Sequence, residues 1–456
     1  MTGRFEEVPG HPIVGNFLDM LADPAGMLLS DATERGDFLS YRFGPWEWLL
    51  INDPEAVRYV LVQNHANYVK SRNYVALKLV IGQGLVTSEG ALWKRQRKLA
   101  QPVFTPKRLL SFLPPMGRCT SDLLEDWERH PSGREVDVHE EMMRLTFRIV
   151  GLTLTGQDLA ADAKEFGTAV GELLEFANRY TENVLRPPIW LPLPSHLRFR
   201  SQLQILDSVV QRLIRERRAN PSENDLLGML LRATDQDGGM SDQQLRDEML
   251  TMILAGHETT AVALSWTWYL LSRHPLIARR LADEVDEVLG DRVPTAADLD
   301  ALEYTERVLK ESMRLFPPVW AVERDALSDD VICGRPIRKG VTVGVAAWTL
   351  HRHRRYWDNP EGFDPDRWLP ERSQGRPRYV YLPFGAGPRV CIGSTFAMME
   401  AKLILAMIVR RYRLELAPGH PVEMDPGITL RPKHGIRVRV VRRDPPASTT
   451  RMARSA

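Results

Sequence analysis

Cysteine is scarce in this sequence, and its few copies lie far apart. The 456 residues include three cysteines, Cys119, Cys333 and Cys391. Because the number is odd and no CxxC pair occurs, we expect neither a disulfide framework nor a cysteine-rich zinc site. Free thiols of this kind are typical of a reducing compartment. We therefore expect a cytoplasmic protein.

Long apolar runs and an excess of one charge are also missing. No run of about eighteen apolar residues occurs, so we expect no membrane span. The first ten residues lack the apolar core of a signal peptide. Lysine and arginine number 60 against 59 aspartates and glutamates, a net charge of +1. We therefore expect no nucleic-acid partner, and any electrostatic partner site must be a local patch.

Composition and patterning indicate one globular domain. Apolar residues make up 43% and charged residues 26%, and no repeat or low-complexity linker divides the chain. We expect a single domain over residues 1–441 and a disordered basic tail over residues 442–456. Hydrophobic periodicity predicts helices over residues 24–36, 54–63, 91–99, 241–274, 302–316 and 392–411, several more within 105–235, and a hairpin over 38–52. Residues 1–23 are expected to be irregular, and residues 64–87 to form a long apolar loop.

The stretch 384–393 reads Phe-Gly-Ala-Gly-Pro-Arg-Val-Cys-Ile-Gly. Its three glycines disfavour a helix or strand interior and suit a tight loop beneath a bulky planar group. Cys391 precedes the predicted helix 392–411, whose dipole and free N–H groups favour a thiolate. A thiolate held in this way can bind a soft metal centre, haem iron among them. For an arbitrary cysteine, a buried free thiol in a turn would be the simpler interpretation.

The unbroken pattern Phe-Gly-x-Gly-x-Arg-x-Cys-x-Gly resembles the cysteine-ligand loop of the cytochrome P450 family, the haem-thiolate monooxygenases, in their soluble bacterial form. The resemblance implies the P450 fold, a single triangular-prism-like domain that is mainly α with small β-sheets. It also implies haem b with Cys391 as axial iron ligand and Arg389 paired with a haem propionate. Phe384 and Gly393 complete the cofactor-binding loop.

The helix over residues 241–274 breaks its own pattern at its centre. Ser241 and Gln244 form a capping box, and Pro275 ends the helix. Between two apolar halves lies Ala255-Gly256-His257-Glu258-Thr259-Thr260. A glycine within a helix and a buried glutamate are both unfavourable, which indicates a function.

This hexapeptide resembles the oxygen-activation motif of the family. The resemblance implies that Gly256 leaves a groove for O2 and water. It implies that Thr259 donates a hydrogen bond during oxygen activation and that Glu258 relays protons from solvent. We interpret His257 as structural.

Further matches concern the haem propionates. Trp93 and Arg97 share one helix face at i, i+4 and offer donors to a carboxylate. They resemble the propionate-binding helix of the family, and Arg324 resembles another propionate ligand. Lys94, Arg95 and Lys98 lie on other faces of that helix. They form either a solvated basic surface or a docking patch for an acidic electron donor, and both interpretations stay open.

Glu311 and Arg314 lie at i, i+3 on a predicted helix. They form either a surface ion pair of little energetic weight or the buried Glu-x-x-Arg of the family, which a second arginine completes. Arg367 is the candidate for that arginine. The surrounding motif departs from the family pattern, with Asp366 and Trp368 where Glu and Phe are usual. We expect a structural triad that fixes the meander carrying Cys391.

Three apolar stretches resemble the walls of the family's substrate pocket: the loop 64–87 as its roof, residues 319–322 above the haem, and the turn 426–430 on the far side. Packing against the core is an equal alternative for any single residue of the loop. The expected pocket residues are Leu77, Val80, Leu85, Ala255, Val319, Trp320, Ile428 and Leu430. Four prolines break the chain over residues 187–194, where the lid of the family joins two helices.

The resemblance implies a monooxygenase of secondary metabolism that hydroxylates or epoxidises an apolar molecule such as a terpenoid, a fatty acid or a related natural-product scaffold. It would use O2 and electrons from a separate ferredoxin or flavodoxin with its NAD(P)H-dependent reductase, and it would act as a monomer. Two alternatives stay open: a peroxide-driven or O2-independent haem-thiolate enzyme, and a non-catalytic haem-binding protein.

Overall fold

A computed structural model describes residues 3–182, 187–222, 225–235 and 238–443. The predicted tail lies outside the described residues from 444 onward. Its first two residues are ordered, since Arg442 ends a strand and the guanidinium of Arg443 donates to Asp286 Oδ2 at 2.7 Å.

Helices dominate the described chain. The first group is α1 (Phe17–Ala22), α2 (Pro24–Glu34), α3 (Pro54–Arg58), α4 (Tyr74–Ile81), α5 (Gly90–Ala100), α6 (Pro106–Leu110), α7 (Leu113–Glu128), α8 (Val138–Val150) and α9 (Ala163–Glu182). The second group is α10 (Pro194–Ala219), α11 (Leu226–Arg232), α12 (Asp242–Arg273), α13 (Pro275–Leu289), α14 (Ala296–Ala301), α15 (Glu303–Leu315), α16 (Ala347–Leu350), α17 (Pro370–Ser373) and α18 (Ser394–Arg411). Shorter π and 3-10 turns are η1 (Tyr59–Gln63), η2 (His65–Asn67), η3 (Gln101–Phe104), η4 (Gly151–Thr155), η5 (Pro365–Trp368), η6 (Arg378–Val380) and η7 (Gly387–Arg389).

The strands form small sheets at the edges of the helical body. A six-stranded sheet has the order β1-β2-β3-β11-β8-β4 and contains β1 (Glu6–Glu7), β2 (Phe38–Phe43), β3 (Trp46–Ile51), β4 (Tyr68–Lys70), β8 (Ala321–Ala326) and β11 (Thr342–Ala346). A three-stranded sheet joins β12 (Tyr412–Leu416), β15 (Arg437–Arg442) and β5 (Arg134–Asp137). The remaining pairs are β9 (Asp330–Ile332) with β10 (Arg335–Ile337), β13 (Met424–Pro426) with β14 (Leu430–Pro432), and β6 (Thr234–Asp235) with β7 (Gly238–Gly239).

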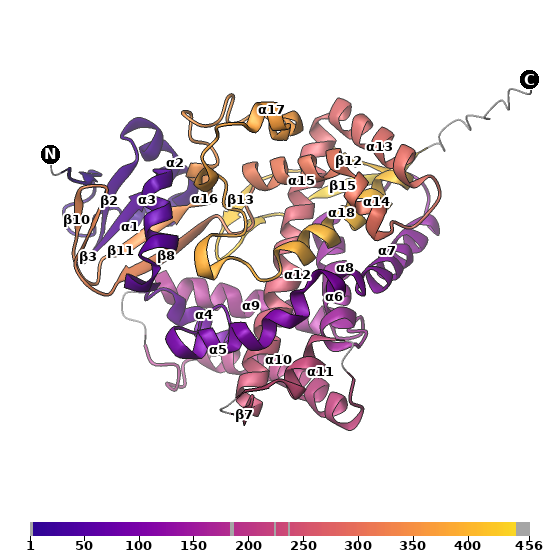
Figure 1. Ribbon diagram of the computed structural model, residues 1–456, viewed down its shortest axis with the longest axis horizontal. Helices are drawn as coiled ribbons and strands as arrows, with labels where there is room; N and C mark the ends of the chain where they lie inside the picture. The colour runs from indigo at the N-terminus through magenta and orange to yellow at the C-terminus, as the bar shows by residue number, and fades with distance from the viewer. Residues whose placement is uncertain (1–2, 183–186, 223–224, 236–237, 444–456) are drawn as a thin grey trace, which may run out of the picture.

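Helix α12 runs through the middle of the molecule, between the six-stranded sheet and the bundle of α7, α13, α14 and α18 (Figure 1). Its first turn has the predicted capping box. Ser241 Oγ accepts from the Gln244 N–H at 3.2 Å, and Gln244 Oε1 accepts from the Ser241 N–H at 3.1 Å. Most of its side chains are buried on every side, as expected for a helix at the centre of a core.

The structure corrects two predictions. The loop expected over residues 64–87 contains η2, β4 and helix α4. The irregular segment 1–23 contains β1 and α1. The hairpin β2–β3 and the break over residues 187–193 agree with the prediction, and α10 begins at Pro194.

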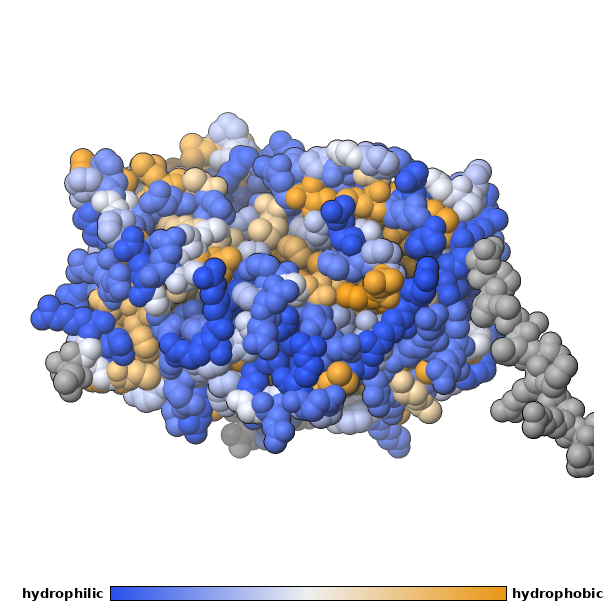
Figure 2. Space-filling view, turned by 90° about the horizontal axis from the view of Figure 1, so that it is seen from above, coloured by the Kyte–Doolittle hydropathy of each residue, from blue (hydrophilic) through white to orange (hydrophobic). Residues whose placement is uncertain are grey.

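The surface agrees with the balanced composition. Figure 2 shows one face, on which hydrophilic residues predominate and hydrophobic residues gather in patches between them. Within the described part of the chain, no helix is long and apolar enough to cross a membrane.

Candidate active site

The predicted hexapeptide lies within one continuous α-helix. Ala255 is exposed and Thr259 is half-buried, although both sit at the centre of a buried helix. The Thr259 hydroxyl donates to the Ala255 carbonyl at 2.8 Å. These two residues therefore keep accessible surface on one side of α12.

Gly256 and His257 have packing roles in this structure. A Cβ on Gly256 would stand 3.1 Å from Val150 Cγ2, so the glycine eases the approach of α8 to α12. The His257 ring contacts the Ile253 carbonyl at 2.8 Å, and burial lowers its pKa. A structural role for His257 agrees with these contacts.

The Glu258 side chain is 4% exposed and forms hydrogen bonds with Arg431 of strand β14 and with Thr429, which precedes that strand. Its Oε1 accepts from the Thr429 hydroxyl at 2.6 Å and from Arg431 Nε at 2.8 Å, and Arg431 Nη2 also lies 2.6 Å away. Burial alone would raise the pKa of Glu258. The Arg431 charge and the Thr429 hydrogen bond outweigh burial and lower the pKa below its ordinary value. Glu258 is therefore an ionised, paired carboxylate.

The glycine-rich loop turns tightly and packs on η1. Gly385 and Gly387 have φ angles of 70° and 68°, where side chains are disfavoured. A Cβ on Gly387 would stand 1.9 Å from the Leu61 carbonyl oxygen. The Cys391 N–H donates to the Phe384 carbonyl at 2.9 Å, which closes the loop.

The Cys391 side chain has accessible surface, although many protein atoms surround it. Burial raises the pKa of its thiol, and the Gly393 N–H and the Arg97 charge oppose that rise. The predicted helix-end effect is thus present but weaker than burial. A coordinating metal ion would still deprotonate the thiol.

Cationic side chains gather beside this loop. Strands β4 and β8 place Lys70 opposite Arg324, and Arg389 stacks 4.1 Å over the Trp93 ring. Burial, followed by the charges of Arg324 and Arg389, lowers the pKa of Lys70 well below its ordinary value. Glu89, which bonds to Arg389 and to the Lys70 N–H, supplies one carboxylate against these cations.

This cluster fits an anionic ligand. Arg389 Nη1 is buried without a hydrogen-bond partner among the described residues. The charges of Arg324 and Arg389 act on Lys70 against the single carboxylate of Glu89, so the cluster carries excess positive charge. Arg97 lies nearby and donates to the Val390 carbonyl at 3.0 Å. A planar group with two carboxylates, such as haem with its propionates, would satisfy these donors while facing the open Cys391 thiol.

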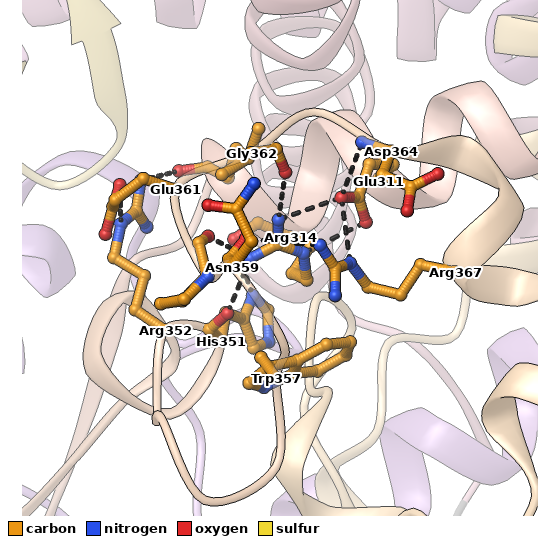
Figure 3. A network of polar contacts seen from close by, with 12 residues as sticks. Glu311, Arg314, His351, Arg352, Trp357, Asn359, Glu361, Gly362, Asp364 and Arg367 are labelled. Carbon is orange, nitrogen blue, oxygen red and sulfur yellow. Dashed lines mark hydrogen bonds and ion pairs between the residues drawn. The ribbon is translucent and has the colours of Figure 1, made fainter.

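Glu311, Arg314 and Arg367 form the predicted triad in the buried form (Figure 3). Arg314 donates to both oxygens of Glu311 at 2.8 and 2.9 Å, and Arg367 Nε donates to Glu311 Oε1 at 3.2 Å. The departure from the family pattern at Trp368 adds a fourth member to this group, because its indole N–H donates to Glu311 Oε2 at 3.0 Å.

His351 links the triad to the cysteine loop. Arg314 Nη1 donates to the His351 carbonyl at 2.9 Å, and His351 Nε2 accepts from the Leu382 N–H at 2.8 Å. Burial and the Arg314 charge lower the pKa of His351 to about 3, so the ring is neutral. The triad therefore holds the backbone two residues before Phe384.

The predicted pocket residues divide into two groups. Leu77, Ala255, Val319, Trp320 and Ile428 keep exposed surface, and the Trp320 indole donates to the Gly427 carbonyl at 2.8 Å. Val80 and Leu430 are fully buried in core clusters, and Leu85 is 7% exposed. Val80 and Leu430 are corrections: helical packing of α4 turns Val80 into the core, and Leu430 packs beside Trp348.

The basic patch is smaller than predicted. Lys94 and Lys98 are exposed on one face of α5. Arg95 is half-buried and donates to the Gly238 carbonyl of β7 at 2.9 Å. Arg95 is thus anchored to its own chain.

Sequence reasoning missed Lys70, Tyr74, Glu89, Thr429 and Arg431. Lys70 also lies 4.5 Å from the Tyr74 ring centroid. Lys70 lies in strand β4 opposite Arg324, a pairing that no local pattern in the sequence indicates. Arg431 directly follows the predicted pocket turn 426–430, and its charge beside an apolar stretch was the available clue.

Comparison with known proteins identifies this architecture. The family model for cytochrome P450 matches residues 6–439. Cyclooctatin synthase of Streptomyces melanosporofaciens is 37% identical, covering 92% of this chain and 92% of that protein. Pentalenene oxygenase of Streptomyces avermitilis is 33% identical, covering 95% and 96%. Cyclooctat-9-en-7-ol 5-monooxygenase of Streptomyces melanosporofaciens is 32% identical, covering 90% and 89%.

The chain belongs to the cytochrome P450 family. It has the P450 fold, and it is an oxidoreductase of the monooxygenase class. The cofactor of this family is haem with a cysteine thiolate as axial ligand, in agreement with the donor set described above.

Proposed function

We propose that this P450 oxidises a terpenoid or a similar lipophilic scaffold, with Cys391 as the iron ligand. The observation that carries the proposal is that apolar and aromatic side chains keep accessible surface in each stretch that resembles the family's pocket: Leu77, Ala255, Val319, Trp320 and Ile428. Relatives named for pentalenene and cyclooctat-9-en-7-ol, which are terpenoid skeletons, support the same substrate class. Haem, when bound, supplies the oxidative chemistry with O2 and two electrons.

A binding screen tests the substrate class. Ligands that displace water from the iron shift the haem absorption, so terpenoids, fatty acids, and charged or sugar-bearing compounds can be compared directly. We expect shifts with terpenoids at the lowest concentrations. Strong shifts only with charged or sugar-bearing compounds would overturn the assignment.

The ligand assignment has its own test. Trp93, Arg97, Arg324 and Arg389 would hold the propionates, and Lys70 would add a fifth donor. The reduced protein under carbon monoxide should absorb at the wavelength typical of thiolate coordination, and Cys391→Ala should abolish that band. Cys333→Ser, at an exposed thiol, is the matched control and should leave the band unchanged.

We infer that Glu258 and Thr259 deliver protons, with Arg431 setting the resting state of the relay. The Arg431 guanidinium keeps Glu258 ionised, and its side chain is 28% exposed, so it connects the buried acid with solvent. Glu258→Gln removes the ionisable group while keeping the acceptor for Thr429. General acid–base catalysis contributes about 10²-fold or more, so turnover should fall by about that factor with little change in substrate affinity.

Product formed per NAD(P)H consumed distinguishes the alternatives. A relay role predicts that Glu258→Gln and Thr259→Ala lower this ratio and release H2O2. A peroxide-driven enzyme would give a different result. Both variants would then keep full activity with H2O2, and the wild type would not turn over with a ferredoxin system.

We infer that electrons arrive from a separate ferredoxin or flavodoxin beside α5. Lys94 and Lys98 are exposed there, whereas Arg95 is anchored. Reversing both lysine charges should slow reduction and flatten its dependence on salt. Reversal of Lys339 and Lys433, exposed lysines outside α5, is the control. Equal reduction rates at all salt concentrations would refute docking at α5.

A further inference from the structure

Two acids on α12 hold the chain that follows α4. Asp247 is 5% exposed and Glu248 is 1% exposed. Asp247 Oδ2 accepts from the Gln83 N–H at 2.8 Å, and Glu248 Oε2 accepts from the Leu85 N–H at 3.1 Å. Successive carboxylates of one helix thus bind alternate amides of residues 82–85.

The backbone of this stretch lies directly on the helix. A Cβ on Gly84 would stand 2.0 Å from Thr251 Oγ1 and 2.6 Å from the Asp247 carbonyl oxygen. A Cβ on Gly82, whose φ is 61°, would stand 2.2 Å from Asp247 Cγ. Only glycine permits this approach, so the contact depends on both partners.

Helix α5 fastens the other side of the stretch. Gln96 Nε2 donates to the Gln83 carbonyl at 2.7 Å, and Gln96 Oε1 accepts from the Ser88 hydroxyl at 2.5 Å. Thr87 Oγ1 donates to the Gly82 carbonyl at 2.7 Å. The same segment continues to Glu89, which binds Arg389 beside the cysteine loop.

The two acids are compensated unequally. Asp247 Oδ1 lies 3.0 Å from Arg246 Nη1, and Arg246 also pairs with Asp207 of α10 at 2.6 Å. Within the described chain, Glu248 Oε1 and Thr251 Oγ1 are buried with no hydrogen-bond partner. Burial raises the pKa of Glu248 to about 7, the Leu85 N–H opposes the rise and the Asp247 charge adds to it. Burying an acid that has no cation beside it is unfavourable. The hydrogen bond from the Leu85 N–H is the contact that partly offsets this cost for Glu248.

We propose that Asp247 and Glu248 are positioning residues that clamp residues 82–85 onto α12 and thereby fix the roof of the substrate pocket. The clamp anchors the C-terminal end of α4, the helix that presents Leu77. It rests on the proposed function, since α4 roofs a pocket only if the substrate binds beside Ala255. If the contacts of Asp247 and Glu248 with residues 82–85 are removed, α4 should move more easily and the pocket should accept larger ligands.

Hydrogen exchange tests the clamp without activity. Glu248→Ala removes the acceptor and leaves the Leu85 amide without its partner, whereas Glu248→Gln keeps an acceptor oxygen. Exchange in a peptide covering residues 82–88 should be about tenfold faster in Glu248→Ala and close to wild type in Glu248→Gln. Asp242→Ala, on the first turn of α12 and paired with Arg218, is the matched control and should leave this peptide unchanged.

Two azoles of different size test the pocket. Imidazole and phenylimidazole bind haem iron and shift its absorption. The ratio of their dissociation constants therefore reports how large a ligand the pocket beside α4 accepts. Glu248→Ala should change this ratio about fivefold in favour of phenylimidazole, and Glu248→Gln should restore it.

Each outcome decides a different point. Unchanged exchange in Glu248→Ala, or equally fast exchange in Glu248→Gln, would refute the clamp. No azole response in the wild type would instead refute the proposed haem site, while exchange still judges the clamp. If Glu248→Ala does not fold, Gly84→Ala should loosen the same peptide from the other side, and full protection in that variant would also refute the clamp.

Discussion

Replacing Glu248 with glutamine should remove a pH-dependent loss of stability. The Glu248 side chain is buried on α12, receives one hydrogen bond, and has an unpartnered oxygen among the described residues. Burial raises its pKa to about 7 from the ordinary value of 4.5. The acid is therefore held protonated in the folded state at pH values where the unfolded chain releases its proton.

The size and sign of the effect follow from proton linkage. A folded-state pKa raised above the unfolded value stabilises the protein fully below pH 4.5, and this contribution is lost as pH rises to about 7. At about 1.36 kcal/mol per pH unit, the loss is about 3 kcal/mol. The difference in unfolding free energy between Glu248→Gln and wild type should grow by about that amount over this range and then stay level.

Urea unfolding of the haem-loaded protein, followed by tryptophan fluorescence at a series of pH values, measures this difference. Glu287→Gln, at an exposed acid of α13, is the matched control and should show a constant difference. A difference that is independent of pH for Glu248→Gln would show that Glu248 is solvated or paired, and would refute the argument from burial.

Two further predictions concern buried acids. Glu311→Ala leaves Arg314 and Arg367 as buried charges without their carboxylate, so it should cost about 3–5 kcal/mol in thermal or urea unfolding; Glu175→Ala, which breaks the exposed pair with Arg179, should cost less than about 1 kcal/mol. Glu400→Gln should stabilise the protein increasingly as pH rises above 4.5, the ordinary pKa of a glutamate. Burial raises the pKa of Glu400 well above that value, and the neighbouring Thr260 opposes this rise only in part. An equal effect at pH 5 and pH 8 would contradict this account of Glu400.

The parts of the site that sequence alone predicts are those with dense local signals. The whole pattern of the loop 384–393 lies within ten residues, and the capping box of Ser241 and Gln244 predicts where α12 begins. Glu311 and Arg314 lie one turn apart, so a single helix brings them together. These features need no knowledge of the tertiary fold.

Helix α4 and the partners of Glu258 were missed for physical reasons. Asn73 makes no side-chain cap for α4, and a helix with apolar residues on most faces has no clear period. Its packing against α9 and α12 forms in the tertiary structure. Arg431 lies 173 residues from Glu258, so no local pattern could pair them.

The short strand β14 joins two parts of the site that sequence treats separately. Thr429 and Arg431 hold Glu258, while Leu430 between them accepts from the Trp266 indole at 2.8 Å and donates its N–H to the Pro318 carbonyl at 2.9 Å. The neighbouring turn presents Ile428 and receives the Trp320 hydrogen bond at Gly427. Alternation along a strand sends adjacent side chains to opposite faces, which lets one strand pack in the core through Leu430 and bind the acid through its neighbours. The contacts that keep Glu258 paired and the turn that presents Ile428 therefore depend on the same short segment of chain.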